Sequence, residues 1–480
     1  MGACEFVDDE QFCILETALT QLGPKEGVIP LELGLDEGSD TTGQVSQVDK
    51  TRLADIISQC GILIAKKPKS TFSPKNLSQD LTRLLKGGRE DMEANRPILD
   101  LKFAPSAISG LLQFVDLMSD TNYHSRVHLE MYNMGKYMRI DTAAQKALNI
   151  MRSKVDSAES FSLHGLLSRC RTAMGKRLLK VWLKQPLTEI SSINARLDVV
   201  ESLINDAALR SDLNGLHLRG MPDIERLTRK LERQTATLQD LCQLYRVSSR
   251  IPHIESILRG HQGDHAESIV KRYAEPLALA HDTEHLSKFE DLLEAAVDLD
   301  RIPDEYLISA SYDADLKDIQ VQKMAIEREI EQAAEAAAED LGLILDKSVK
   351  LEWHKVSNQK IRCLRITAKE EKSVRKKLQA KYIELETRKD GVKFTSRRLR
   401  NAAQQLQHLS SEYDAKQSIL VKQVVAVAAT FSEVWEKVAA ILGDLDVLCG
   451  FAEVATSAPT PYTRPEILPQ DGKHSVIRYF

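Results

Sequence analysis

The feature that most constrains the fold of this sequence is a long series of apolar residues at helical spacing toward its C-terminal end. These residues step by threes and fours from Leu406 to Leu448, with one larger gap at Lys416. Apolar residues at this spacing lie on one face of an α-helix. We therefore predict one long helix over Asn401–Leu448, about 70 Å in length at 1.5 Å per residue, which packs on a helical core.

A second helix is predicted between Leu316 and Asp340. A seven-residue apolar repeat runs through this segment, with Lys323 and Asp340 as its two charged members, and such a repeat favours a slender helix with a narrow apolar seam. Between the two helices, three segments have strand-like composition, and the last two flank Asp390-Gly391, a typical hairpin turn. The three segments are Ile361–Thr367, Tyr382–Thr387 and Val392–Thr395. An outgoing helix, a small tip and a returning helix describe an arm.

The first 103 residues mix short helices and strands. Val28-Ile29 and Ile62–Ala65 are predicted strands, the second of them buried, and Gly34–Gly43 is a predicted loop. This mixture is typical of an α/β region with few strands.

Helical spacing prevails from Ala104 to Asp300, apart from a β-like stretch at Tyr123–Ile140. One helix is predicted over Leu163–Leu183, where apolar residues fit one face and Gln185-Pro186 stops the run. The fold class is therefore mainly α.

Composition excludes several classes of protein. The chain is 42% hydrophobic and 28% charged, as in ordinary globular proteins, and no apolar run approaches the roughly 18 residues that span a bilayer. The first ten residues are acidic, unlike a secretory signal. The seven cysteines include no C-x-x-C pair, which favours reduced, buried thiols over zinc or redox chemistry.

Positive charge is concentrated at the predicted tip. Residues 347–400 contain 18 Lys and Arg and 6 Asp and Glu, a local balance of +12 in a chain of net charge −5. A basic island on an acidic protein indicates one localised polyanion contact. The candidate phosphate-binding residues are Lys372, Arg375 and Lys376, which share one helix face, and Lys389, Lys393, Arg397 and Arg398 in and after the hairpin. The alternative is a solvated charged surface.

Other chemical motifs are incomplete. Met174-Gly175-Lys176-Arg177 lacks the first Gly of a phosphate-binding loop, where Cys170 stands, and its Ser or Thr, where Arg177 stands; Gly472-Lys473 fails in the same way. His124 and His128 have no Cys partner for a metal site. We therefore expect no ATP hydrolysis, no catalytic residues, and no cofactor or metal bound by this chain.

Several segments resemble proteins of the MutS DNA mismatch-repair family in collinear order. They are Met138–Ala144, Met174–Leu179, Trp182–Leu187, Arg196–Glu201, Glu386–Thr395 and Pro459–Pro465. The Glu386–Thr395 segment is similar to the clamp of the eukaryotic MutS homologue two, in its plant-like form.

The resemblance implies five parts: a partial α/β connector domain at 1–103, a helical core and lever at 104–304, an inserted clamp of helices and a small antiparallel sheet at 305–400, a returning lever helix at 401–452, and a link toward an ATPase domain at 453–480. It also implies that the mismatch-reading and ATPase domains, with the ATP and Mg²⁺ of the full-length family, lie outside this sequence. Arg388 joins the candidate backbone contacts on this basis.

The partners that the resemblance implies are double-stranded DNA, a second MutS homologue (six, three or the plant-specific seven) in a heterodimer, and MutL-type proteins, with action in the nucleus and no membrane. Two departures qualify it. Glu352–Lys360 differs from the family's usual Gln-Phe-Gly segment, and Phe431-Ser432-Glu433 mimics the family's mismatch wedge but falls in the returning helix, where packing is expected. The alternative function is a helical scaffold that binds partner proteins and not DNA.

Overall fold

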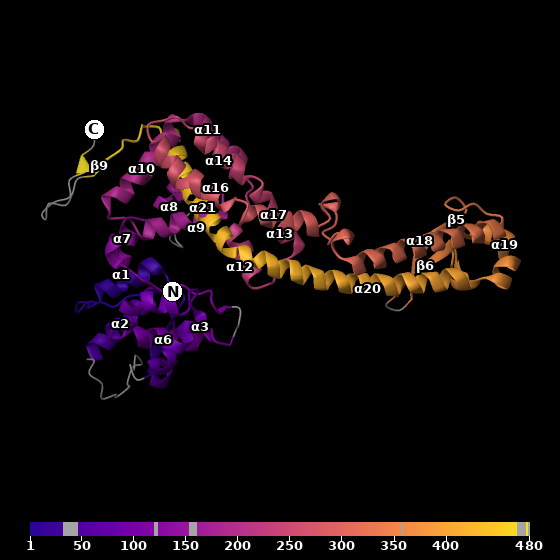
Figure 1. The fold of residues 1–480 in the computed structure, drawn as a ribbon, viewed down its shortest axis with the longest axis horizontal. Helices are drawn as coiled ribbons and strands as arrows, with labels where there is room; N and C mark the ends of the chain where they lie inside the picture. The colour runs from indigo at the N-terminus through magenta and orange to yellow at the C-terminus, as the bar shows by residue number, and fades with distance from the viewer. Residues whose placement is uncertain (32–46, 120–122, 153–160, 357–358, 468–476, 479–480) are drawn as a thin grey trace. The chain divides into compact units, whose positions relative to one another are not determined.

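The computed structural model describes residues 1–31, 47–119, 123–152, 161–356, 359–467 and 477–478 (Figure 1). The chain divides into two compact units. The first, here called the core unit, comprises Met1–Arg233, Val247–Asp282 and Glu433–Phe480. The second, the arm unit, comprises Gln234–Arg246 and Thr283–Ser432. No helix in the described part of the chain has the length and apolar character needed to cross a membrane.

The core unit begins with a small α/β region. Its elements are β1 (Gly2–Ala3), α1 (Cys13–Leu22), β2 (Glu26–Pro30), α2 (Gln47–Gln59), β3 (Leu63–Lys67), α3 (Leu77–Leu84), α4 (Arg89–Ala94), α5 (Arg96–Leu99), α6 (Ala104–Val115) and β4 (Glu130–Met131). Strands β2 and β3 pair in parallel. The prediction that the second strand is buried is wrong: Leu63 is 71% exposed, because a sheet of two described strands leaves its outer edges and much of its surface open. The loop predicted at Gly34–Gly43 lies outside the described residues.

The helical part of the core unit follows. Its elements are α7 (Thr142–Ala147), α8 (Leu163–Leu167), α9 (Ala173–Lys184), α10 (Ile190–Asn205), α11 (Ala207–Asp212), α12 (Ile224–Glu232), α14 (Ile251–Gly260), α15 (Ala266–Ile269), α16 (Glu275–Ala280), α21 (Ser432–Ser457, its first residue assigned to the arm unit) and the short strands β9 (Glu466–Ile467) and β10 (Ile477–Arg478), while α13 (Leu238–Ser248) ends in it. The single helix predicted over Leu163–Leu183 is wrong, because Thr172 starts a new one. Its side chain accepts a hydrogen bond from the backbone N–H of Gly175, which caps α9.

The arm unit contains the outgoing and returning helices that the sequence predicts. Its further elements are α17 (Leu286–Ala296), α18 (Ala314–Leu341), β5 (Val349–Val356), β6 (Gln359–Thr367), α19 (Ala368–Lys381), β7 (Ile383–Arg388), β8 (Gly391–Thr395) and α20 (Arg397–Ala428). Helices α18 and α20 lie side by side, with the strands and α19 at one end of the pair (Figure 1). The four strands form an antiparallel sheet in the order β5-β6-β8-β7. Strand β5 is an element that the sequence pattern does not predict.

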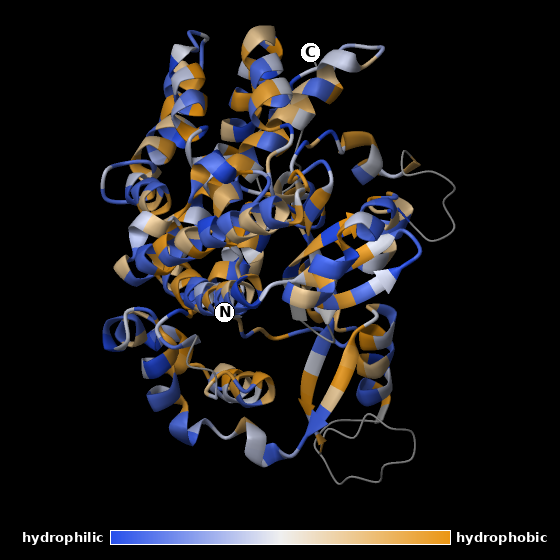
Figure 2. Cartoon of the chain, turned by 90° about the vertical axis from the view of Figure 1, so that its right-hand side faces the viewer, coloured by the Kyte–Doolittle hydropathy of each residue, from blue (hydrophilic) through white to orange (hydrophobic). Residues whose placement is uncertain are grey.

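The small sheet and its helices share one apolar core. The sheet contributes five almost fully buried side chains to it, those of Val349, Leu364, Ile366, Val392 and Phe394. They pack with residues of α18, α19 and the first turns of α20, so the sheet is held to the helix pair by burial on one face. Hydrophobic and hydrophilic residues alternate along these strands and helices (Figure 2). We call β5, β6, α19, β7, β8 and the first turn of α20 the arm tip.

The returning segment is not one uninterrupted α-helix, so that part of the prediction is wrong. A 3₁₀ turn at Ala429–Phe431 separates α20 from α21. The Thr430 hydroxyl donates to the Val427 carbonyl at 2.7 Å, and the Ser432 hydroxyl donates to the Ala429 carbonyl at 2.8 Å. Such side-chain bonds compete with the backbone ladder of a helix. Phe431 packs edge-on against Phe289, with ring centroids 5.7 Å apart, as expected for a packing residue.

Candidate nucleic-acid interface

Helix α19 presents two different faces. Thr367 and Glu370 form a capping box at its start, and Val374 and Leu378 turn into the core of the arm tip. The opposite face carries exposed cations, which are Lys372, Arg375 and Lys376. Residues three and four apart share a helix face, so the spacing explains why these three lie together. None of their side chains forms an ion pair or hydrogen bond with a residue that the structure describes.

The other basic residues of α19 hold the helix to α18. Lys381 Nζ lies 2.7 Å from Asp340 Oδ1, and Lys377 Nζ donates to the Asp340 carbonyl at 3.1 Å. The Tyr382 hydroxyl donates to Asp340 Oδ2 at 3.1 Å. Lys381 in the first place, and then Tyr382, hold the pKa of Asp340 below its usual value. These two lysines are therefore structural, whereas the exposed face of α19 remains open to a ligand.

The β7–β8 hairpin forms at the predicted turn. Arg388, which is 67% exposed, pairs with Glu386 on its own strand at 2.7 Å. Lys389 at the turn is exposed, and its side chain has no partner in the described part of the chain. Asp390 accepts a hydrogen bond from Arg365 at 2.7 Å, which ties the turn to β6.

The side chain of Lys393 is less exposed than its position in the hairpin suggests. Its side chain is only 21% exposed; Nζ lies 3.5 Å from Glu352 Oε2 and donates to the Trp353 carbonyl at 3.4 Å. Glu352 also pairs with Arg365 at 3.1 Å. Cys363 lies opposite Glu352 in the β5–β6 ladder and is fully buried, and this burial raises the pKa of its thiol to about 11. The charge of Lys393 is therefore largely balanced within the sheet.

The start of α20 is unusually basic. Ser396 caps the helix, and Arg397, Arg398 and Arg400 occupy its first turn, where the helix dipole disfavours positive charge. Arg398 pairs with Glu329 of α18 at 3.1 Å. Arg397 is exposed and its side chain has no partner among the described residues. An anion bound there would relieve the unfavourable interaction with the dipole.

The predicted contacts thus fall into two sets. The unpaired cations have exposed side chains without a described partner; they are Lys372, Arg375, Lys376, Lys389 and Arg397. The paired cations each lie within 4 Å of a carboxylate; they are Arg388, Lys393 and Arg398. Further exposed cations escaped the sequence prediction; they are Lys350 on β5, Lys347 just before that strand, Lys369 on α19 and Arg400 on α20. The alternation of Val349, Lys350, Leu351 and Glu352 is the signal that could have revealed the first.

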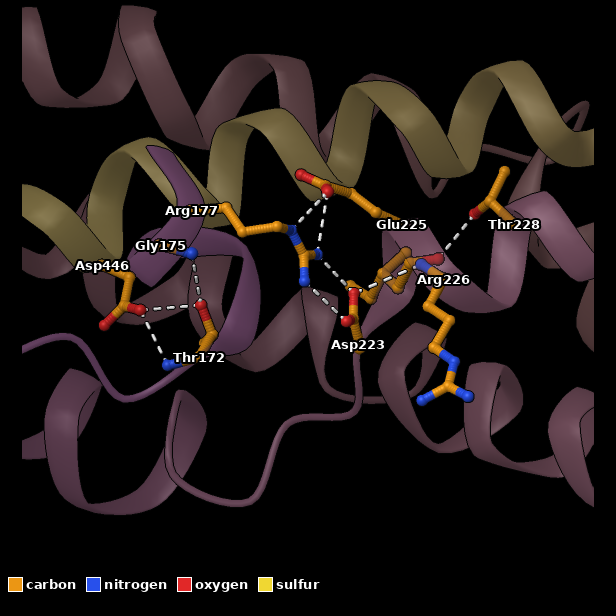
Figure 3. A network of polar contacts seen from close by, with 9 residues as sticks. Thr172, Gly175, Arg177, Asp223, Glu225, Arg226, Thr228 and Asp446 are labelled. Carbon is orange, nitrogen blue, oxygen red and sulfur yellow. Dashed lines mark hydrogen bonds and ion pairs between the residues drawn. The ribbon is translucent and has the colours of Figure 1, made fainter. Parts of the chain in front are cut away.

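In the core unit, the segment that mimics a phosphate-binding loop has a structural role (Figure 3). Asp446 of α21 is fully buried and accepts hydrogen bonds from the backbone N–H groups of Arg171 and Thr172, both at 2.8 Å, and from the Thr172 hydroxyl at 2.7 Å. Burial raises the pKa of Asp446, and these hydrogen bonds oppose the rise. A Cβ on Gly175 would lie 2.2 Å from Asp446 Oδ2, so this glycine allows α9 and α21 to approach.

Arg177, in the same segment, binds two acids at the start of α12, its N-cap Asp223 and Glu225. Its guanidinium lies 2.6 Å from Asp223 and 2.8 Å from Glu225, and it holds the pKa of Asp223 below its usual value. The position that a nucleotide-binding loop fills with a hydroxyl therefore carries a salt bridge here. No group of three or more His, Cys, Asp or Glu side chains gathers into a metal site within the described ranges.

Comparisons with known proteins match most of the chain. The family MutS domain III matches residues 143–452. The chain is 40% identical to the DNA mismatch repair protein MSH2 of Arabidopsis thaliana over 99% of its own length and 49% of that protein. It is 39% identical to MSH2 of Zea mays, over 98% of this chain and 48% of that one, and 33% identical to MSH2 of Saccharomyces cerevisiae, over 98% and 50%.

The protein therefore belongs to the MutS family of DNA mismatch-repair proteins. The resemblance to the eukaryotic MSH2 members, those of plants included, is confirmed, and so is the predicted fold class. The chain spans about half the length of the curated relatives it matches.

Proposed function

We propose that this chain binds the backbone of double-stranded DNA through its arm tip, as a subunit of a MutS-type heterodimer in mismatch repair. The observation that carries the proposal is the set of five unpaired cations, all exposed at one end of the α18–α20 pair. Lys and Arg that neutralise phosphates release condensed counterions, and this supplies affinity without reading the bases.

The cost of keeping these cations in place supports a ligand for them. Lys372, Arg375 and Lys376 repel one another on one face of α19, and like charges at this spacing destabilise a helix. Arg397 opposes the dipole of α20. Other cations of the tip do have acidic partners. Glu352 and Asp390 pair with Arg365, and Glu386 pairs with Arg388.

The remaining features of the proposal rest on family membership and on the sequence. A second MutS homologue would complete the clamp around the duplex, MutL-type proteins would act downstream, and the site of action would be the nucleus. The chain itself would not turn over ATP, because the sequences around Gly175-Lys176 and Gly472-Lys473 lack residues that a phosphate-binding loop requires; Gly472-Lys473 lies outside the described residues. ATP turnover by the purified chain that a point substitution within it abolishes would contradict this part.

Salt-dependent duplex binding tests the proposal. The full chain and a variant with all five unpaired cations changed to Ala are titrated with a fully paired duplex at several salt concentrations. Each lost phosphate contact reduces the log–log salt slope by about 0.9, so the variant should lose most of the slope. A variant with Ala at the three paired cations is the matched control, and its slope should change less per residue. If the five-residue variant keeps both affinity and slope, the tip is a solvated surface and a protein-binding scaffold becomes the better proposal.

A further inference from the structure

One of the three tryptophans stands apart from the other two. Trp353 on β5 is 51% exposed, whereas Trp435 is fully buried and Trp182 lies against Phe451 and under Arg196. A large apolar ring left half in water is costly, because its burial would remove much apolar area from solvent.

A cation holds this ring in place. Trp353 pairs with Arg362 across the β5–β6 ladder, and the Arg362 guanidinium carbon lies 4.2 Å from the centroid of the indole ring. A guanidinium over an aromatic face is attracted by the ring quadrupole. The ring is therefore oriented by one stacked cation while half of its surface remains accessible.

A lysine contacts the backbone beside the ring. Lys393 donates to the backbone carbonyl of Trp353. The β6–β8 ladder ends at the pair Leu364–Phe394, which lies two residues from Arg362 on β6 and three residues before the unpaired cation Arg397. A polyanion drawn to the start of α20 would thus meet the aromatic ring at the neighbouring end of the sheet.

We propose that Trp353 and Arg362 form a stacking site for an unpaired nucleobase of a nucleic acid whose backbone the arm tip holds. This inference rests on the proposed backbone binding. Every base has a π-face, so stacking on an aromatic ring is tolerant of sequence and combines with basic grooves that follow the backbone. Bases inside a duplex are already stacked on each other, so the site selects single-stranded segments, such as an overhang or a gap beside duplex.

The test compares a blunt duplex with the same duplex carrying a single-stranded thymidine overhang, using the full chain. Trp353→Ala should weaken binding of the overhang substrate about fivefold or more, from the 1–3 kcal/mol per base that stacking contributes, and leave the blunt duplex unchanged. Trp353→Phe keeps a ring and should retain most of the affinity. The overhang should quench the tryptophan emission of the wild type, and Trp353→Phe should abolish that quenching, because Trp435 is buried and Trp182 is partly buried and belongs to the core unit.

The outcomes separate this inference from the proposed function. Equal weakening of blunt and overhang substrates by Trp353→Ala would overturn stacking, since the ring would then serve general binding. Unchanged binding of both substrates without quenching would also overturn it, and would leave the ring to protein contacts. Backbone binding itself is judged by the five-cation variant on the blunt duplex, a result that Trp353 does not influence.

Discussion

Two aspartates, one in each unit, show that charged side chains have different roles in the core unit and in the arm unit. Asp446 in the core unit is fully buried and is satisfied by three hydrogen-bond donors, and burial raises its pKa. Asp340 in the arm unit is met by Lys381 and Tyr382 at the surface, which lower its pKa. One carboxylate organises a packed helix junction, and the other fastens a helix whose opposite face is basic. Polar groups in the core unit thus complete structure, while the arm tip keeps cations in excess of its acids.

The largest effect in this comparison is expected from Asp446→Ala. The substitution leaves three donors without their acceptor: the N–H groups of Arg171 and Thr172 and the Thr172 hydroxyl. Each unsatisfied donor should lower the free energy of unfolding by roughly 1 kcal/mol or more, a total of about 3 kcal/mol. Denaturant unfolding measures the change. Asp414→Ala, at an exposed position of α20, is the control and should change the free energy of unfolding by no more than about 0.5 kcal/mol. A small loss at Asp446 would mean that solvent reaches this junction.

Gly175→Ala should be the next most severe change. The new Cβ would lie 2.2 Å from Asp446 Oδ2, so α9 and α21 must separate, at about 1–3 kcal/mol as in other overpacked sites. Gly260→Ala is matched, since its Cβ would meet nothing within 4 Å in a helix. That control should be neutral or slightly stabilising. Equal thermal stabilities of the two variants would contradict the close approach.

A pair of lysines sharpens the comparison within the arm tip. Lys389→Ala removes an unpaired cation and should reduce the log–log salt slope of duplex binding by about 0.9. Lys393→Ala removes a cation already beside Glu352 and should change that slope less. The reverse order would show that Lys393 leaves Glu352 when DNA binds.

The two aspartates should respond to pH with opposite sign. The raised pKa of Asp446 means that the native state binds its proton more tightly, so the stability of the wild type relative to Asp446→Asn should fall as pH rises from the unfolded value of about 3.8 through the native pKa. The lowered pKa of Asp340 means that its contribution, judged against Asp340→Asn, should be present above about pH 3.8 and lost as pH falls through the native value. Denaturant unfolding across this pH range measures both stability differences. If the two differences changed in the same direction with pH, the assignment would be wrong.

The smallest effect is expected where the bases change and the backbone does not. A mispaired and a fully paired duplex of equal length should bind this chain with nearly equal affinity, because the unpaired cations address phosphates. Competition between the two duplexes measures the ratio. A clear preference for the mispaired duplex would show base reading by residues that the arm tip does not explain.

Periodic patterns predicted the arm because they arise from local geometry. The apolar spacing after Leu406 and the turn at Asp390-Gly391 each depend on residues close in sequence, and the helix pair and hairpin are confirmed. The pairing of Lys393 with Glu352 could not be predicted in this way, because it requires the register of strands that are 41 residues apart. The 3₁₀ turn at Ala429–Phe431 also escaped, since hydroxyl groups of Thr430 and Ser432 interrupt a pattern that apolar spacing alone continues. The assignment of individual DNA contacts stays a prediction.

The contrast in charge between α18 and α19 bears on how quickly and in what orientation a duplex arrives. Helix α18 carries eight Asp and Glu against three Lys and Arg, and α19 carries six Lys and Arg against two Glu. An approaching polyanion is repelled along the length of α18 and attracted at α19, and such fields orient diffusing molecules before contact. Encounters of DNA with the side of α18 would therefore be disfavoured, and productive encounters would begin at α19. The association rate should fall with added salt, because salt screens both the repulsion and the attraction.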